Sequence, residues 1–84
     1  MYRIVKITDV FGFHKTDDAS IRRIGRIVDI DESAILLGHS AFIVYESHDT
    51  YFMTSTVKKV NVTENGIVIE TQNSKYYFER LDDA

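Results

Sequence analysis

The fold of this chain is decided by one stretch near its C-terminal end, VKKVNVTENGIVIETQNSKYYFER, residues 57–80. Three segments of this stretch, at 57–62, 67–70 and 75–80, alternate apolar with polar side chains. A period of two is typical of strands that bury one face. Because only short polar turns separate the three segments, the stretch predicts a three-stranded antiparallel meander.

The same alternation predicts which side chains point inward. The expected inward residues are Val60, Val62, Ile67, Ile69, Tyr76 and Phe78. The pair Asn65-Gly66 predicts a type I′ hairpin turn, whose two central residues need positive φ. In the next turn, and at residues 54–56, serine and threonine hydroxyls are expected to cap backbone N–H groups where the strands bend.

Four further strands are expected upstream of the meander, each bounded by polar or glycine-containing turns. In the first of them, alternation places Val5 and Ile7 on one face and Tyr2 and Ile4 on the other. The continuous apolar run in the third indicates either a central strand covered on both sides or a strand that wraps round a small barrel. The expected segments are 2–10, 26–31, 40–47 and 50–55.

Two stretches remain ambiguous. Ile21 and Ile24 are three residues apart, and Asp17 or Asp18 could cap a helix there, which favours one or two helical turns near residues 18–24. The alternative is a loop that leads directly into the next strand. The segment Ala34-Ile35-Leu36-Leu37-Gly38 is either a strand or a helical turn closed by glycine.

Composition favours the same fold class. Ile, Val, Thr, Tyr and Phe make up 35 of the 84 residues, whereas there are three Leu and four Ala. Side chains that are β-branched or aromatic pack well on a pleated surface. A chain of this length supports one domain with one small core. We therefore expect a single, mostly β domain, a small SH3-like barrel of six to seven short antiparallel strands.

Three segments carry a resemblance to known proteins: LGHSA at 37–41, YFMTSTV at 51–57 and IVIETQNSKY at 67–76. Their recurring elements are a Thr-Ser-x-Val step and a Thr-x-Asn-Ser-x-Tyr closing hairpin. In these elements the C-terminal half of the chain resembles small bacterial and phage SH3-like β-barrel proteins without assigned function. The resemblance implies the barrel fold and carries over no catalytic residue.

Composition also excludes several classes of protein. The chain has no cysteine, which excludes a disulfide framework and a thiolate zinc site. Its net charge of −3 gives no overall attraction to nucleic acid or anionic lipid. No apolar run approaches a membrane span, and the first residues lack the apolar core of a signal peptide. We therefore expect a cytoplasmic protein that does not bind membranes.

Neither a catalytic site nor a metal site is predicted. No nucleophile elbow, phosphate-binding glycine loop or metalloprotease motif is present. His14, His39 and His48, with Asp49 as a fourth candidate, lack the spacing that places metal ligands on one face of a strand or helix. We expect a non-enzymatic protein that has no cofactor.

The first functional hypothesis is a binding, assembly or regulatory module that acts through protein–protein contacts. Aromatic triplets at 51–53 and 76–78 must leave at least one side chain outward, and the loop after the first strand carries two phenylalanines. Self-association through edge strands is the simplest form of this hypothesis. The candidate partner surface consists of Phe11, Phe13, Tyr51, Met53 and Tyr77.

The alternative hypothesis is an accessory protein that binds single-stranded DNA or RNA. Small barrels bind single strands by stacking bases on aromatic rings beside a basic groove. The candidate basic patch consists of Arg22, Arg23, Arg26, Lys58 and Lys59, and the candidate stacking rings are Tyr45, Tyr51, Tyr76 and Tyr77. The alternative for these arginines is pairing with nearby carboxylates, of which the candidates are Asp17, Asp18 and Asp29.

Overall fold

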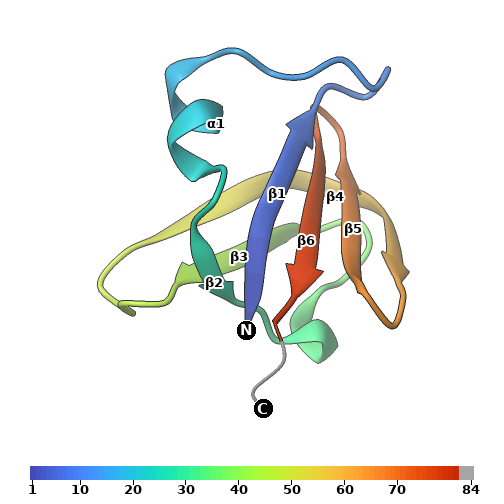
Figure 1. Cartoon of the computed structure of the whole chain (residues 1–84). Coiled ribbons are helices and arrows are strands. Elements are labelled where there is room, and N and C mark those ends of the chain that lie inside the picture. Colours follow the sequence, from blue (N-terminus) through green and yellow to red (C-terminus); the bar gives the residue numbers. More distant parts are fainter. Residues whose placement is uncertain (82–84) are drawn as a thin grey trace.

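Six antiparallel strands follow one another in sequence order round a closed barrel, in which the first strand pairs with the last (Figure 1). The computed structural model describes residues 1–81. Its elements are β1 (Tyr2–Thr8), α1 (Asp18–Arg23), β2 (Ile27–Asp29), the 3-10 helix η1 (Glu32–Ala34), β3 (Ser40–Tyr45), β4 (Tyr51–Val62), β5 (Gly66–Thr71) and β6 (Lys75–Arg80). This confirms a small, mostly β barrel with one short helix near residues 18–24.

The predicted meander is formed by β4, β5 and β6. Alternation placed its central side chains correctly, because Ile67, Ile69, Tyr76 and Phe78 are all buried. Val62 is the exception: it is half exposed at the end of β4, where the strand runs past the core.

The turn between β5 and β6 uses the predicted hydroxyl chemistry. The Thr71 hydroxyl accepts a hydrogen bond from the Ser74 backbone N–H at 3.1 Å and donates one to the Ser74 carbonyl oxygen at 3.1 Å. The Ser55 hydroxyl lies 2.8 Å from the same Thr71 oxygen and accepts from the Asn73 N–H at 3.3 Å. Side chains of β4 and β5 thereby hold this turn in place.

The turn between β4 and β5 differs from the prediction of a type I′ turn. Thr63 and Gly66 face each other across it, and their backbones exchange hydrogen bonds of 2.8 and 3.4 Å. The central residues are therefore Glu64 and Asn65, and neither they nor Gly66 has positive φ. Gly66 is needed for a different reason, since a Cβ at this position would overlap the carbonyl oxygen of Phe78 on β6.

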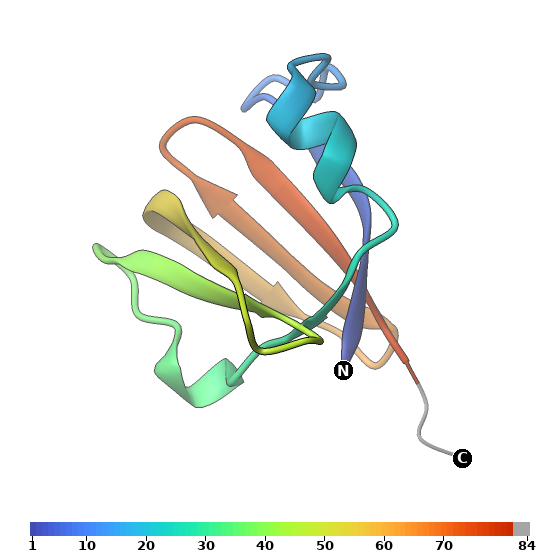
Figure 2. The same ribbon diagram turned by 90° about the vertical axis from the view of Figure 1, so that its left-hand side faces the viewer.

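The two strands expected at 50–55 and 57–62 are one strand, β4. Its first part pairs with β3 and its second part with β5, and the register shifts between Val57 and Lys59. The Thr54 hydroxyl lies buried near the bend and accepts a hydrogen bond from the Ala41 N–H of β3 at 2.9 Å. Figure 2 shows β4 curving from one side of the barrel to the other.

The predicted faces of β1 were wrong because the strand contains a bulge. The register against β6 shifts between Ile4 and Lys6, which adds one residue to the spacing. As a result Tyr2, Ile4 and Ile7 all point into the core, while Val5 is half exposed.

Neither alternative for residues 34–38, a strand or a helical turn closed by glycine, is found. The 3-10 helix η1 ends at Ala34. A turn follows, in which the His39 N–H donates to the Leu36 carbonyl oxygen at 3.2 Å and Gly38 has φ +84°. β3 wraps round the barrel and is not covered on both sides. Ala41 and Ile43 are buried, whereas the Phe42 side chain is 54% exposed on the outer surface.

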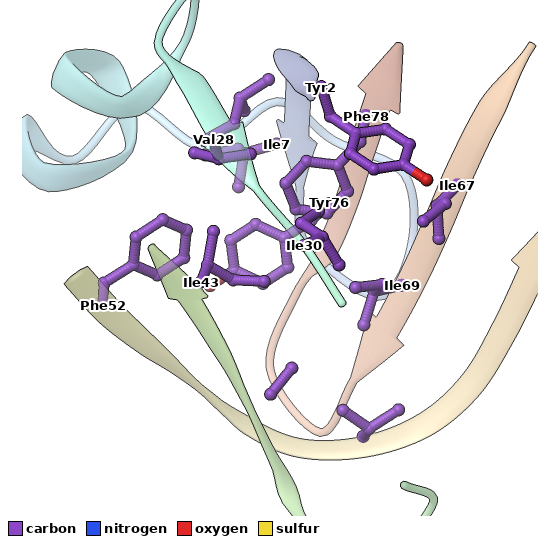
Figure 3. Packing of buried hydrophobic residues seen from close by; sticks show 13 residues of the cluster. Tyr2, Ile7, Val28, Ile30, Ile43, Phe52, Ile67, Ile69, Tyr76 and Phe78 are labelled. Carbon is purple, nitrogen blue, oxygen red and sulfur yellow. The ribbon is translucent and has the colours of Figure 1, made fainter. Parts of the chain in front are cut away.

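The core lies inside the barrel and receives side chains from every strand (Figure 3). Tyr76 lies between Phe52 and Phe78, with ring centroids 5.9 and 6.3 Å apart. Aliphatic side chains fill the remaining space, among them Ile4, Ile7, Val28, Ile43, Val57, Ile67 and Ile69.

The two ends of the barrel differ. The connection from β1 to α1 crosses one end, and η1 lies at the other (Figures 1 and 2). At the η1 end the Leu81 N–H donates to the Met1 carbonyl oxygen at 3.0 Å, so the start of β1 and the end of β6 lie side by side.

Gly66→Ala is expected to destabilise the barrel by about 3 kcal/mol or more, because the new methyl group meets backbone atoms that hold β6 in register. Gly12→Ala is the matched control. Gly12 has φ +95° but open space round its missing Cβ, so its cost is about 1 kcal/mol. Urea unfolding of both variants measures the difference, and equal losses would contradict the predicted overlap.

Candidate functional site

A short helix places two of the candidate arginines. The Asp17 carboxylate caps α1 by accepting a hydrogen bond from the Ser20 N–H at 3.0 Å. Hydrogen bonds from Ser20 lower the pKa of Asp17 below its ordinary value. Arg22 and Arg23 occupy the last turn, where cations interact favourably with the helix dipole.

The chain then turns at Gly25, which has φ +87° and donates its N–H to the Ile4 carbonyl oxygen at 2.7 Å. The Arg26 carbonyl oxygen accepts from the Ile4 N–H at 3.0 Å. Arg26 is therefore fixed to β1 directly after the helix, on the same side of the barrel as α1.

The three arginines line one open groove of about 210 Å³, together with Tyr45, Tyr51 and Phe52. We call it the arginine groove. The Arg23 guanidinium lies 4.2 Å from the centroid of the Phe52 ring, and that of Arg26 lies 4.2 Å from the centroid of Tyr45. Both distances are within the range of cation–π attraction.

The arginines have no carboxylate partner among residues 1–81. Three ion pairs occur in this part of the chain, namely Arg3–Glu79, Lys75–Glu70 and Arg80–Glu32. The alternative that Arg22, Arg23 and Arg26 pair with nearby aspartates is thus not what the structure contains. Asp17 caps α1 instead.

The predicted five-residue basic patch divides into separate parts. Lys58 and Lys59 lie on the half of β4 that pairs with β5, and Lys59 faces Glu70 there. Lys59 shares a shallow hollow with Lys75 and Tyr77, and neither Lys58 nor Lys59 lines the arginine groove.

The candidate partner surface is also divided. Tyr51 and Met53 lie on the outer surface where β4 pairs with β3, and they are 57% and 58% exposed. Phe42 lies beside them, opposite Met53 and stacked on Tyr51 with ring centroids 4.4 Å apart. We call Phe42, Tyr51 and Met53 the aromatic face. Tyr51 also lines the arginine groove, so the two surfaces are continuous.

Tyr77 does not belong to the aromatic face. It lies on β6, which pairs with β5 and β1 and is three strands away from β3 round the closed barrel. The Lys6 ammonium lies 4.9 Å from the centroid of its ring. The expected patch of Tyr77 with Tyr51 or Met53 is therefore absent from residues 1–81.

Phe11 and Phe13 form a third surface, at the end of the barrel crossed by the β1–α1 connection (Figure 1). Their side chains are 83% and 72% exposed. One side chain holds the backbone beneath them: the Asp9 Oδ1 accepts from the Phe11 N–H at 2.9 Å and from the Phe13 N–H at 3.0 Å. We call residues Phe11, Gly12 and Phe13 the Phe tip.

Backbone contacts fix the Phe tip further. The Asp9 N–H donates to the Phe13 carbonyl oxygen at 2.8 Å, and the Gly12 N–H donates to the Asp9 carbonyl oxygen at 3.1 Å. His14 forms an isolated bridge with Thr8 of β1. The two phenylalanines thus extend from an ordered turn.

A charged cluster closes the η1 end of the barrel. The Tyr2 hydroxyl donates to the Glu32 carboxylate, and the Arg80 guanidinium donates to the same carboxylate at 3.2 Å. The hydrogen bond from Tyr2, followed by the charge of Arg80, lowers the pKa of Glu32. Burial, and then the bond to Glu32, raises the pKa of Tyr2. This cluster attaches η1 to β1 and β6, and all its members have partners.

The three histidines do not meet in a metal site. Among residues 1–81, no three histidine, aspartate or glutamate side chains gather as a metal ion would require. None of the helices in this part of the chain has both the length and the apolar character needed to cross a membrane.

Comparison with known proteins adds no relative: no protein-family model, curated protein or solved structure matches this chain. The surfaces described above therefore stand on their own geometry.

Several residues of these surfaces were not predicted from sequence. The residues concerned are Asp9, Phe42 and Phe52. Phe42 could have been found, because alternation along residues 40–47 puts it on the opposite face from Ile43. No local signal indicates that Phe52 lies beneath an arginine 29 positions earlier in the chain.

Glu32→Gln is expected to flatten the loss of stability in acid. Since the pKa of Glu32 is lowered by folding, its stabilising effect is present above the ordinary glutamate value of 4.5 and is lost as pH falls through the folded-state pKa. Urea midpoints of the unchanged protein should therefore fall more steeply below about pH 5 than those of the variant.

The matched control is Glu46→Gln, because Glu46 is exposed and forms no ion pair among residues 1–81. This variant should keep the acid dependence of the unchanged protein. Identical profiles for all three proteins would show that the cluster has no influence on acid stability.

Proposed function

We propose that this chain is a non-enzymatic binding module that contacts a partner protein through the Phe tip. The observation that carries the proposal is the exposure of Phe11 and Phe13 on a turn whose backbone is already ordered. Fully burying a phenylalanine side chain contributes about 1.5–3 kcal/mol. Two such side chains would make a small but effective anchor.

Pre-organisation strengthens this argument. Ordering a loop on binding costs free energy that must be subtracted from the affinity. Here the Asp9 carboxylate and the bridge between Thr8 and His14 hold the turn in the unbound protein. Both phenylalanine side chains are largely exposed on this turn, so the partner surface that fits them is an apolar pocket.

The closed sheet bears on how the contact forms. β1 pairs with β6, so the barrel does not end in two long free strands. This supports a contact made by side chains, in place of the pairing of edge strands that was expected from the sequence. The bent β4 shared by two halves of the barrel supports the further proposal that the barrel is of the SH3-like kind. A cytoplasmic location stays a prediction.

A photoreactive residue at the tip tests the proposal. With p-benzoylphenylalanine in place of Phe11, irradiation of cells that produce the protein should give one dominant covalent adduct with another protein. Adding Phe13→Ala should remove it, because half of the apolar anchor is then missing. The same photoreactive residue at Val62, which is half exposed on β4, is the position control.

Titration of the purified adduct partner completes this test. Phe11→Ala and Phe13→Ala should each weaken binding about tenfold or more, since each removes at least about 1.5 kcal/mol of burial. Urea midpoints should stay unchanged, because both side chains are exposed. The proposal fails if positions 11 and 62 capture the same proteins equally, or if Phe13→Ala binds as tightly as the unchanged protein.

Asp9→Ala tests whether the ordered backbone of the Phe tip contributes to partner binding separately from the two phenylalanine rings. It removes the acceptor that holds the Phe11 and Phe13 N–H groups and leaves both rings in place. We expect weaker partner binding, with a reduced association rate, since the turn must then be ordered on binding. Asp9→Asn keeps the acceptor oxygen and should bind nearly as well as the unchanged protein.

A further inference from the structure

The arginine groove has a property that the Phe tip does not explain. Three guanidinium groups, those of Arg22, Arg23 and Arg26, line one hollow without any carboxylate within ion-pair distance among residues 1–81. A chain with 13 acidic and 10 basic residues offers enough carboxylates to neutralise such a cluster. The local positive charge is therefore available to an anionic ligand.

Ring contacts set the orientation of two of these groups. Arg23 lies over Phe52 and Arg26 over Tyr45, each 4.2 Å from the ring centroid. A guanidinium held against a ring keeps its N–H donors at its edge, where they can bind phosphate oxygens in pairs. Its side chain is also partly immobilised before the ligand arrives, which lowers the entropic cost of binding.

Aromatic rings continue from the groove onto the outer surface. Tyr51 lines the groove and stacks on Phe42, and both rings are more than half exposed. Proteins that bind single strands without reading sequence combine a positively charged groove with rings on which bases stack. An acidic peptide would use the arginines alone and would leave these two ring faces without a role.

We propose that the arginine groove and the adjacent Phe42–Tyr51 pair bind single-stranded nucleic acid. The guanidinium groups of Arg22, Arg23 and Arg26 contact the phosphates, and Tyr51 with Phe42 receives one or two bases. Lys58 and Lys59 lie outside the site. This site is separate from the Phe tip, and the proposal holds whether or not the tip binds a protein.

Charge sets the expected strength. The protein as a whole carries −3, so attraction to a polyanion is local and strongest at low salt. With three phosphate contacts, the logarithm of the binding constant should fall with the logarithm of salt concentration with a slope of about −2. Binding should be weak at physiological salt, where the Debye length is about 8 Å, and readily measured at about 20 mM salt, where it is roughly 20 Å.

Fluorescence anisotropy with labelled dT12 and rU12 tests the proposal with the full chain. The two probes distinguish DNA from RNA, and binding of either with the expected salt slope supports the proposal. Arg22→Glu is the main variant, because Arg22 has no cation–π contact among residues 1–81, whereas Arg23 and Arg26 each lie over a ring whose packing should be kept. We expect it to weaken binding about tenfold or more at low salt.

The matched control is Lys58→Ala combined with Lys59→Ala. This double variant removes two positive charges from the other half of β4 and should change affinity less than about twofold. If it weakens binding as much as Arg22→Glu does, the interaction is with net charge and the site assignment is wrong.

Tyr51→Ala tests stacking separately from charge. Removing a stacking ring costs about 1–3 kcal/mol for each base. We expect binding to weaken about fivefold or more with an unchanged salt slope, because the phosphate contacts remain. Phe42→Leu keeps the apolar character of the neighbouring position but removes the second ring, and should give a smaller loss of the same kind.

Three results would overturn the proposal. The first is the absence of binding to both probes near 20 mM salt, where phosphate contacts are strongest. The second is equal binding of inorganic polyphosphate with no effect of Tyr51→Ala, which would indicate an unspecific anion site. The third is tighter binding of a poly-glutamate peptide than of dT12 and rU12, which would assign the groove to an acidic protein.

Discussion

The bend of β4 is the constraint on which the rest of the structure depends. One strand of 12 residues pairs with β3 along its first part and with β5 along its second, and the register shift after Val57 allows the change of direction. This bend brings the meander and the N-terminal strands round a single core. It also positions the start of β4, with Tyr51 and Phe52, beneath α1.

The arginine groove is a consequence of how few residues the barrel has for its core. Phe52 and Tyr45 each contact both the core and an arginine. Their ring centroids lie 5.7 Å apart at the margin of the core, and a guanidinium group lies over each ring. A larger domain could bury such rings completely. In a chain of 84 residues the edge of the core becomes part of the surface, and the arginines cover it.

The sequence predicts those parts of the fold that local rules determine. Ile67, Ile69, Tyr76 and Phe78 are placed correctly because alternation in a hairpin needs no distant information. The bulge at Val5 and the continuity of β4 depend on how the barrel closes, which no local pattern encodes. The candidate site also divides into a part that local sequence predicts and a part that it does not. The cluster of arginines is visible in the sequence. The separation of these arginines from Lys58 and Lys59 is not, because it results from the pairing of β4 with two different strands.

The backbone hydrogen bond from Leu81 to Met1 holds residues 1 and 81 together at one end of the barrel. Both ends of the described chain lie at the η1 end of the barrel, and the Phe tip projects from the opposite end (Figure 1). A domain or affinity tag joined covalently to the chain at residue 1 is therefore attached at the end of the barrel opposite the tip. Several copies could be tethered to one surface by this end and still present their tips in the same direction.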